Sequence, residues 1–308
     1  MAVSWPEGKR FAFTIFDDTD LATEENVRDV YALLADLGFR TTKSVWPLRG
    51  KERPLIGGST CEDPAYLRWL YRLQKMDFEI GYHLATYHSS TRDETIRGID
   101  RFKELFGHDP ISMANHADCI ESMYWGNHRL TDINSLLYNM QTRFRNRGRF
   151  RGHIEGDRHF WGDVCRERVA HVRNFVFEDI NTLKACRFMP YHDADRPYVR
   201  NWFASSEGAD VHSFIRTVSE RNQDRLEAEG GACIMYTHFA KGFCDNGALH
   251  AEFRKLMHKL SARKGWFVPV ATLLDYIVST RGPYTITRAE KLALERKWLW
   301  HKTLAGPT

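Results

Sequence analysis

The chain has 308 residues, of which 43% are hydrophobic and 27% are charged, and this globular composition excludes extensive disorder. Its 44 Lys and Arg residues barely outnumber its 40 Asp and Glu residues, so the net charge of +4 does not indicate a nucleic-acid-binding protein. No apolar stretch approaches the ~18 residues that a membrane-spanning helix requires. The length allows one large α/β domain or two small ones.

The cysteines and the first residues bear on the cell compartment. Six cysteines occur without paired spacing, at Cys61, Cys119, Cys165, Cys186, Cys233 and Cys244. The first residues lack the basic and apolar regions of a secretion signal. These features favour a cytoplasmic protein with reduced thiols, and a homo-oligomer is compatible with the sequence.

Short apolar runs alternate with helical patterns through the first part of the chain. Apolar and aromatic residues predict strands at 10–16, 39–45, 78–82 and 111–114. Apolar residues at helical spacing predict helices at 24–37, 64–76 and 92–106. Strands separated by helices must pair in parallel through right-handed crossovers, which predicts an α/β sheet or barrel.

The next part of the chain begins with a less regular region. Residues 118–195 are rich in Gly, Asn and aromatic residues, and we interpret them as a long loop region with short helices. The alternation then returns, with strands predicted at 202–204, 232–237 and 266–268 and helices near 211, at 249–263 and at 273–278. The sequence therefore predicts one domain over residues 1–282.

The composition changes after Gly282 and Pro283. Thr287 and Glu290 form a capping box at the start of a basic, Trp-containing helix that continues to His301. We interpret residues 283–308 as a helical tail that packs on the domain or on a partner subunit. Docking of this tail on a membrane surface is the alternative.

Two adjacent carboxylates, Asp17 and Asp18, directly follow the first predicted strand. Such a pair needs solvent, a cation or hydrogen bonds to stabilise it. The carboxyl ends of parallel strands are also where sites form in α/β folds. The alternative is a turn or a helix cap, because Thr19, Asp20 and Thr23 offer the same capping chemistry.

Histidines follow three further predicted strands. His83 ends one strand and His88 lies five residues later, and neutral imidazoles that lie close together suit a Zn-like divalent ion. Asn115 and His116 end a second strand. His238 ends a third, where a titratable group could act as a general acid or base. Each histidine alone fits a satisfied surface or core residue, but four strands that end in Asp or His favour one shared site.

The order of these residues resembles that of the polysaccharide deacetylase family, also called carbohydrate esterase family 4. The family's Thr-Phe-Asp-Asp-Gly motif is similar to residues 14–19. Its His-Ser/Thr-x-x-His motif, after a Glu-Ile-Gly strand, is similar to residues 79–88, with the second His one residue late. Its last strand ends in His, as residues 234–238 do, and residues 266–274 resemble the segment that follows. The resemblance covers about residues 9–280.

The resemblance implies a distorted seven-stranded (β/α) barrel, followed here by the C-terminal helical tail. It also implies a metal-dependent deacetylase that acts on an N-acetylated sugar or glycan intermediate. By this analogy Asp17 is the general base, and Asp18, His83 and His88 bind a divalent ion, expected to be Zn. His238 is then the general acid that protonates the leaving amine.

The sequence departs from the family at two motifs. The third motif holds an Arg that positions the base, whereas the equivalent strand here reads Met-Ala-Asn-His and ends in Asn115 and His116. Both are candidates for substrate binding or support, and His116 is the alternative to His88 as a metal ligand. For the Asp and Trp of the fourth motif, Trp202 and Asp210 lie near the expected place, and Trp202 is a further candidate for substrate binding or support. Two other functions stay open: hydrolysis of a different C–N amide bond, and an inactive member that binds a glycan or a protein.

Overall fold

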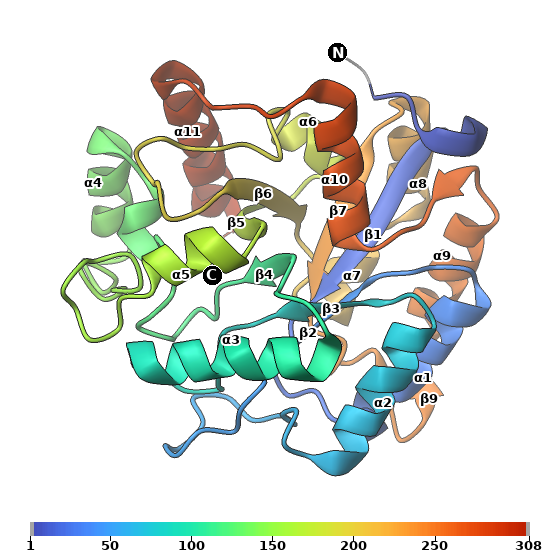
Figure 1. Cartoon of the computed structure of the whole chain (residues 1–308). Helices are drawn as coiled ribbons and strands as arrows, with labels where there is room; N and C mark the ends of the chain where they lie inside the picture. The colour runs from blue at the N-terminus through green and yellow to red at the C-terminus, as the bar shows by residue number, and fades with distance from the viewer. Residues whose placement is uncertain (1–2, 306–308) are drawn as a thin grey trace.

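Seven parallel strands close into a barrel in the computed structural model, which describes residues 3–305 (Figure 1). In barrel order they are β1 (Phe11–Asp17), β2 (Thr42–Val45), β3 (Glu79–Tyr82), β4 (Ser112–Ala114), β5 (His171–Phe177), β6 (Asn201–Ser206) and β7 (Ala232–Thr237). Pairing of β7 with β1 closes the sheet, so the expected seven-stranded (β/α) barrel is confirmed. Residues 1–2 and 306–308, which we assigned to the domain and to the tail, lie outside the described residues.

The first strand shows how the barrel is distorted. All of β1 is buried, as its nearly unbroken apolar sequence requires of a central parallel strand. One edge of β1 pairs with β2 only at its carboxyl end, at Phe16 and Asp17. The amino end of β1, at Phe11 and Ala12, pairs with the short strand β10 (Gly265–Trp266). Because β2 is displaced along β1, an eighth strand supplements the barrel at that end.

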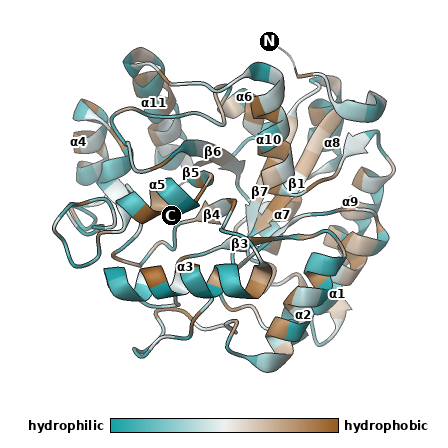
Figure 2. Cartoon of the chain, viewed as in Figure 1, coloured by the Kyte–Doolittle hydropathy of each residue, from teal (hydrophilic) through white to brown (hydrophobic). Residues whose placement is uncertain are grey.

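Helices cover the outside of the barrel (Figure 1). They include α1 (Glu24–Asp36), α2 (Pro64–Lys75), α3 (Arg92–Phe106), α7 (Val211–Thr217), α8 (Glu220–Ala228), α9 (Ala251–Ser261) and α10 (Val270–Arg281). A 3-10 turn, η1 (Pro6–Gly8), precedes β1, and a small hairpin consists of β8 (Cys244–Asp245) and β9 (Ala248–Leu249). In Figure 2, β1 is almost uniformly hydrophobic and α3 alternates between hydrophobic and hydrophilic, as expected of a buried strand and a helix with one exposed face.

The region 118–195 contains more regular structure than its sequence indicates. It holds the 3-10 turn η2 (Gly126–Arg129), the helices α4 (Asp132–Gln141), α5 (Gly162–Arg168) and α6 (Thr182–Ala185), and the barrel strand β5. The expectation of a loop was wrong for β5, because His171, Arg173 and Asn174 interrupt its apolar pattern. All three polar side chains are buried, and the first two have acidic partners: Asp275 for His171 and Asp18 for Arg173.

The tail helix α11 (Arg288–Ala305) packs against α4 and β5. Its buried Glu295 accepts hydrogen bonds from the backbone N–H and the hydroxyl of Thr131, at 2.9 and 2.8 Å, and from Asn134. The Trp298 ring lies 5.2 Å from the ring of Phe175 in β5, measured between centroids. Of the placements considered for the tail, packing on the domain is the one observed. Within residues 3–305, no helix has the length and apolarity that crossing a bilayer demands.

Candidate metal centre and active site

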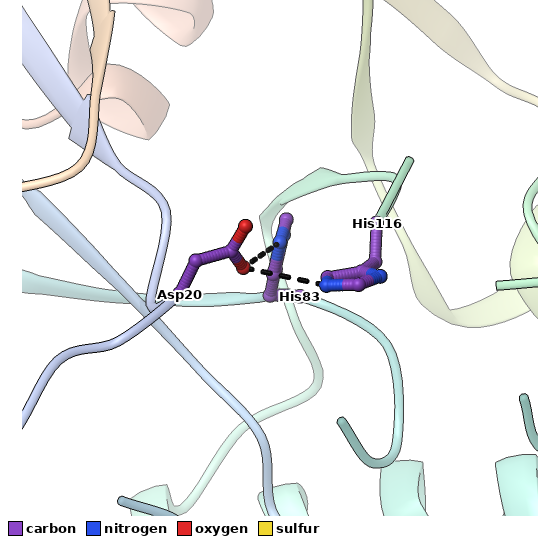
Figure 3. Close-up of side chains that lie close together, drawn as sticks. All are labelled: Asp20, His83 and His116. Atoms are coloured by element: carbon purple, nitrogen blue, oxygen red, sulfur yellow. Dashed lines mark ion pairs between the residues drawn. The ribbon is translucent and has the colours of Figure 1, made fainter. Parts of the chain in front are cut away.

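Loops at the carboxyl ends of four barrel strands bring one aspartate and three histidines together. Asp20 follows β1, His83 follows β3, His116 follows β4 and His238 follows β7. Asp20 Oδ1 lies 3.2 Å from His83 Nε2 and 3.5 Å from His116 Nε2, and Figure 3 shows the three side chains converging. Asp20 Oδ2 lies 3.2 Å from His238 Nε2. The groups meet because the carboxyl ends of parallel strands share one end of the barrel.

Three of these side chains, Asp20, His83 and His116, fit a transition-metal ion. One donor atom of each lies within 4.8 Å of the other two, and a carboxylate with two imidazoles is a suitable ligand set for Zn²⁺. Burial lowers the pKa of His116 to about 4, so its ring is neutral at neutral pH, as a metal ligand must be. Burial raises the pKa of Asp20, but hydrogen bonds with His238 and His83 outweigh burial and hold that pKa well below its usual value. The carboxylate is therefore ionised and ready to bind a cation.

Neighbouring side chains fix the orientation of the two imidazoles. The Trp46 ring packs against both, with centroids 6.0 Å from the ring of His83 and 5.8 Å from that of His116. Cys119 Sγ lies 3.3 Å from His116 Nδ1, the nitrogen that faces away from Asp20. Such outer contacts keep ligands in place before an ion binds.

Arg173 of β5 holds Asp18 beside this cluster. Its two terminal nitrogens donate to the two carboxylate oxygens of Asp18, at 2.9 and 2.5 Å, and both side chains are buried. Burial raises the pKa of Asp18, yet the attraction of Arg173 outweighs burial, and the pKa lies below its usual value. Asp18 is therefore an ionised carboxylate with a fixed orientation. The sequence does not predict that Arg173 belongs to the site, because the polar residues of β5 interrupt the apolar pattern by which a strand is recognised.

Asp17 lies in a different environment from Asp18. Its Oδ2 is 2.9 Å from Lys43 Nζ and 3.0 Å from the Tyr31 hydroxyl, and its Oδ1 accepts the backbone N–H of Phe239 at 2.9 Å. Asp17 and Lys43 both have side chains that are 0% exposed. The structure thus places Asp17 in a buried ion pair.

His88 lies apart from the cluster of Asp20 and the three histidines. Its Nε2 faces Glu94 at 3.9 Å. The chain turns at Leu84, which has a left-handed φ of 68°, and the Thr86 hydroxyl bonds with both the N–H and the carbonyl of His88. This tight loop accounts for the direction of His88. His116, the alternative ligand, lies in the cluster instead.

His238 directs one ring nitrogen at the cluster. Its Nδ1 lies 2.8 Å from the carbonyl oxygen of Ala209, which can only accept a hydrogen bond, so Nδ1 carries a proton. Its Nε2 faces the Asp20 carboxylate at 3.2 Å, so Nε2 is the nitrogen that can exchange a proton at the cluster.

The two remaining candidates have different surroundings. Asn115 exchanges two hydrogen bonds with the backbone of Met123, at 3.0 and 2.8 Å, and so fixes the loop after β4. Trp202 is buried in β6, and its ring centroid lies 6.1 Å from that of Tyr124. Asn115 lines the cavity beside the cluster, whereas Trp202 does not.

This cavity has a volume of about 230 Å³. Part of its lining is the site itself, with Asp18, Asp20, His83 and His238. Another part comes from the 118–151 segment and the tail helix, with Trp125, Arg129, Arg149, Trp298 and Lys302. The tail is therefore part of the wall of the candidate site.

Neither a protein-family model nor a curated protein matches the sequence. Solved structures do match. A protein from Mycobacterium smegmatis assigned as a polysaccharide deacetylase is 14% identical, with a TM-score of 0.54, over 93% of this chain and 97% of that one. One from Pseudomonas aeruginosa PAO1 with the same assignment is 11% identical, with a TM-score of 0.53, over 90% and 94%. Puue allantoinase is 12% identical, with a TM-score of 0.53, over 90% and 93%. The chain therefore has the fold of the polysaccharide deacetylases, the family whose motifs its sequence resembles.

Proposed function

We propose that the chain is a metal-dependent hydrolase that removes the acetyl group from an N-acetylated sugar or glycan intermediate. The observation that carries the proposal is the meeting of the Asp-His-His cluster, the Asp18–Arg173 pair and His238 at one end of the barrel. Metal ligands, a fixed carboxylate and an imidazole that can donate a proton are the groups that amide hydrolysis requires. The fold shared with two proteins assigned as polysaccharide deacetylases supports an N-acetylated carbohydrate as the substrate.

Asp20, His83 and His116 would hold the divalent ion, Zn²⁺ foremost, which when bound would polarise the acetyl carbonyl and acidify water. Asp18 accepts the proton of the attacking water on a carboxylate oxygen. The water oxygen bonds to the carbonyl carbon and the C–N bond breaks. His238 donates the proton on Nε2 to the leaving nitrogen, so the products are acetate and a free amine.

These roles differ from those that the family resemblance implies for the two adjacent aspartates. Asp17 is enclosed with Lys43, whereas Asp18 lines the cavity, which favours Asp18 as the base. Asp20 directs its oxygens at the histidines, which favours Asp20 as the ligand. Arg173 supplies from β5 the cation that the third motif lacks in this sequence.

Hydrolysis of another C–N amide bond is the second candidate. The observation that favours it is the fold shared with an allantoinase. The same cluster, base and acid would serve that reaction, because only the group around the scissile bond differs.

The test combines metal content with product release. Protein purified without chelator should contain one divalent ion per chain by elemental analysis, and it should release acetate from a member of a panel of N-acetylated sugars, nucleotide sugars and lipid-linked glycans. Asp20→Asn should lose the ion and the activity, whereas the matched control His88→Gln should keep the ion. A wild-type chain that neither binds a divalent ion nor releases acetate after one is added contradicts the proposal. Ring-opening hydrolysis of allantoin, with no acetate released from any N-acetylated probe, would favour the second candidate. Glycan binding without turnover would indicate an inactive binding protein.

A further inference from the structure

Arg129 is a buried cation in the wall of the candidate site. It ends the turn η2, is 6% exposed and lines the cavity that also contains Asp20, His83 and His238. It thus shares a cavity with the groups proposed to act on the amide.

The neighbours of Arg129 are aromatic and neutral. Its guanidinium carbon lies 3.7 Å from the ring centroid of Trp125 and 4.7 Å from that of Trp298. One terminal N–H donates to the carbonyl oxygen of Asn174 at 3.3 Å, and the Tyr138 hydroxyl is another polar neighbour. Nε has no hydrogen-bond partner among the described residues. The rings restrict the orientation of the guanidinium but supply no negative charge.

Every other buried cation of residues 3–305 has a carboxylate partner. Lys43 pairs with Asp17, Arg173 with Asp18, Arg196 with Asp193 and Glu295, and Lys291 with Asp193 and Asp195. No ion pair joins Arg129 to a carboxylate in that part of the chain. A buried charge is costly unless it is paired, and an arginine does not escape this cost by losing its proton. The fold therefore keeps one buried cation without an anion, and keeps it in the cavity.

We propose that Arg129 binds an anionic group of the substrate, so that the substrate is an N-acetylated compound that also carries a carboxylate or a phosphate. This inference rests on the proposed function, because it places the amide at the cluster of Asp20, His83 and His116. The planar guanidinium fork matches both anions. Arg149 and Lys302, which line the same cavity, add positive charge, and Arg149 is already paired with Asp118. Arg129 is the buried guanidinium of this wall without a carboxylate partner among the described residues, so we assign the selection of the anion to it.

The first experiment compares substrates that differ in one anionic group. The probes are N-acetylglucosamine, its 6-phosphate and 1-phosphate, and N-acetylmuramic acid, with the metal-loaded full chain. We expect kcat/KM for a phosphorylated or a carboxylated probe to exceed that for N-acetylglucosamine by about tenfold or more. Comparison of the two phosphorylated probes with N-acetylmuramic acid shows whether the site prefers a phosphate or a carboxylate. A neutral probe that is turned over as well as the best anionic one overturns the inference.

Arg129→Met removes the charge and keeps an apolar side chain between the two tryptophans. We expect this variant to lose the preference for the anionic probe. Arg147→Gln is the control, because Arg147 is exposed, lies in the same basic segment and does not line the cavity. Arg129→Lys keeps the charge without the fork and should retain part of the preference. If Arg129→Met does not fold, the inference is tested by the wild-type preference for the anionic probe and by its partial loss in Arg129→Lys.

A binding experiment separates failure of this inference from failure of the proposed function. Glucose 6-phosphate, glucuronate and glucose contain no acetyl group, so their binding by calorimetry does not depend on turnover. We expect an anionic sugar to bind at least about tenfold more tightly than glucose, with the difference lost in Arg129→Met. Such a result supports the Arg129 site even if no probe is hydrolysed. Equal binding of glucose and both anions, or a preference that survives in Arg129→Met, overturns it.

Discussion

Asp17 and Asp18 are consecutive, yet each is paired with a different buried cation. Asp17 Oδ2 lies 2.9 Å from Lys43 Nζ, whereas Asp18 Oδ2 lies 2.5 Å from Arg173 Nη2. Asp17 is the last residue of β1, and successive side chains of an extended chain point to opposite sides. One carboxylate therefore contributes to the buried wall of the barrel and the other lines the cavity.

Replacement of Asp18 should impair chemistry and leave metal binding intact. Asp18→Asn keeps the shape of the side chain but removes the base, so we expect turnover to fall by about 10²–10⁴-fold. The metal content should stay at the wild-type level, because the three proposed ligands are unchanged. Steady-state kinetics and elemental analysis of the same preparation check both parts. Loss of the ion in Asp18→Asn would identify Asp18 as a ligand.

Replacement of Asp17 should impair stability instead. In Asp17→Asn the buried Lys43 loses its anionic partner, and breaking one side of a buried pair costs roughly 3–5 kcal/mol. Denaturant unfolding should show this loss, while the exposed control Asp245→Asn should unfold like the wild type. The double variant Asp17→Asn/Lys43→Met should recover part of the stability, since no unpaired charge remains. A stable but inactive Asp17→Asn would return the role of base to Asp17.

The second imidazole ligand can be identified by metal affinity. His116→Ala should weaken binding of Zn²⁺ by at least about tenfold, because the proposed ligand set loses a donor. His88→Ala should bind the ion as the wild type does, since its side chain faces Glu94. Competition with a chromogenic chelator measures both affinities. The opposite pattern would restore the ligand that the resemblance implies.

The role of His238 as an acid predicts a dependence on the leaving group. His238→Gln should reduce amide hydrolysis by about 10²–10⁴-fold, because the leaving nitrogen needs a proton. Hydrolysis of 4-nitrophenyl acetate should fall much less, because nitrophenolate leaves without one. Rates with both substrates, measured on one metal-loaded preparation, give the comparison. Equal losses would show that His238 acts on binding or on the ion.

The raised pKa of Glu121 predicts how the free energy of unfolding changes with pH. It is fully buried, and burial raises its pKa from the ordinary 4.5 to about 8. Between these values the folded chain holds a proton that the unfolded chain has released, so stability falls as the pH rises from about 4.5 to about 8. Glu121→Gln mimics the protonated form and should flatten this fall.

The effect should be on the order of a few kcal/mol at most. Denaturant unfolding of wild type and Glu121→Gln across this pH range measures it. Exposed Glu52→Gln is the control and should follow the wild type. Parallel curves for the wild type and Glu121→Gln would mean that Glu121 is ionised in the folded chain.

The sequence predicts the barrel better than it predicts the site. Strands such as β1 and β7 are almost continuous apolar runs, so their burial is evident from residue type alone. Strand β5 cannot be predicted in this way, because the polar residue Arg173 interrupts its apolar pattern. Arg173 is buried there because it pairs with Asp18, and this contact is visible only in the folded structure. His116 lies in the metal cluster and His88 does not, in part because the chain turns at Leu84 with a left-handed φ. Leucine rarely adopts this conformation, so the sequence does not predict the turn.

The position of Trp298 and Lys302 in the cavity wall has a consequence for biosynthesis. The proposed base, acid and ligands all lie before residue 239, whereas this part of the wall comes from α11. Domains generally fold as units during synthesis. Because α11 supplies part of the wall, the cavity has its full outline only after α11 has emerged from the ribosome and packed against the barrel.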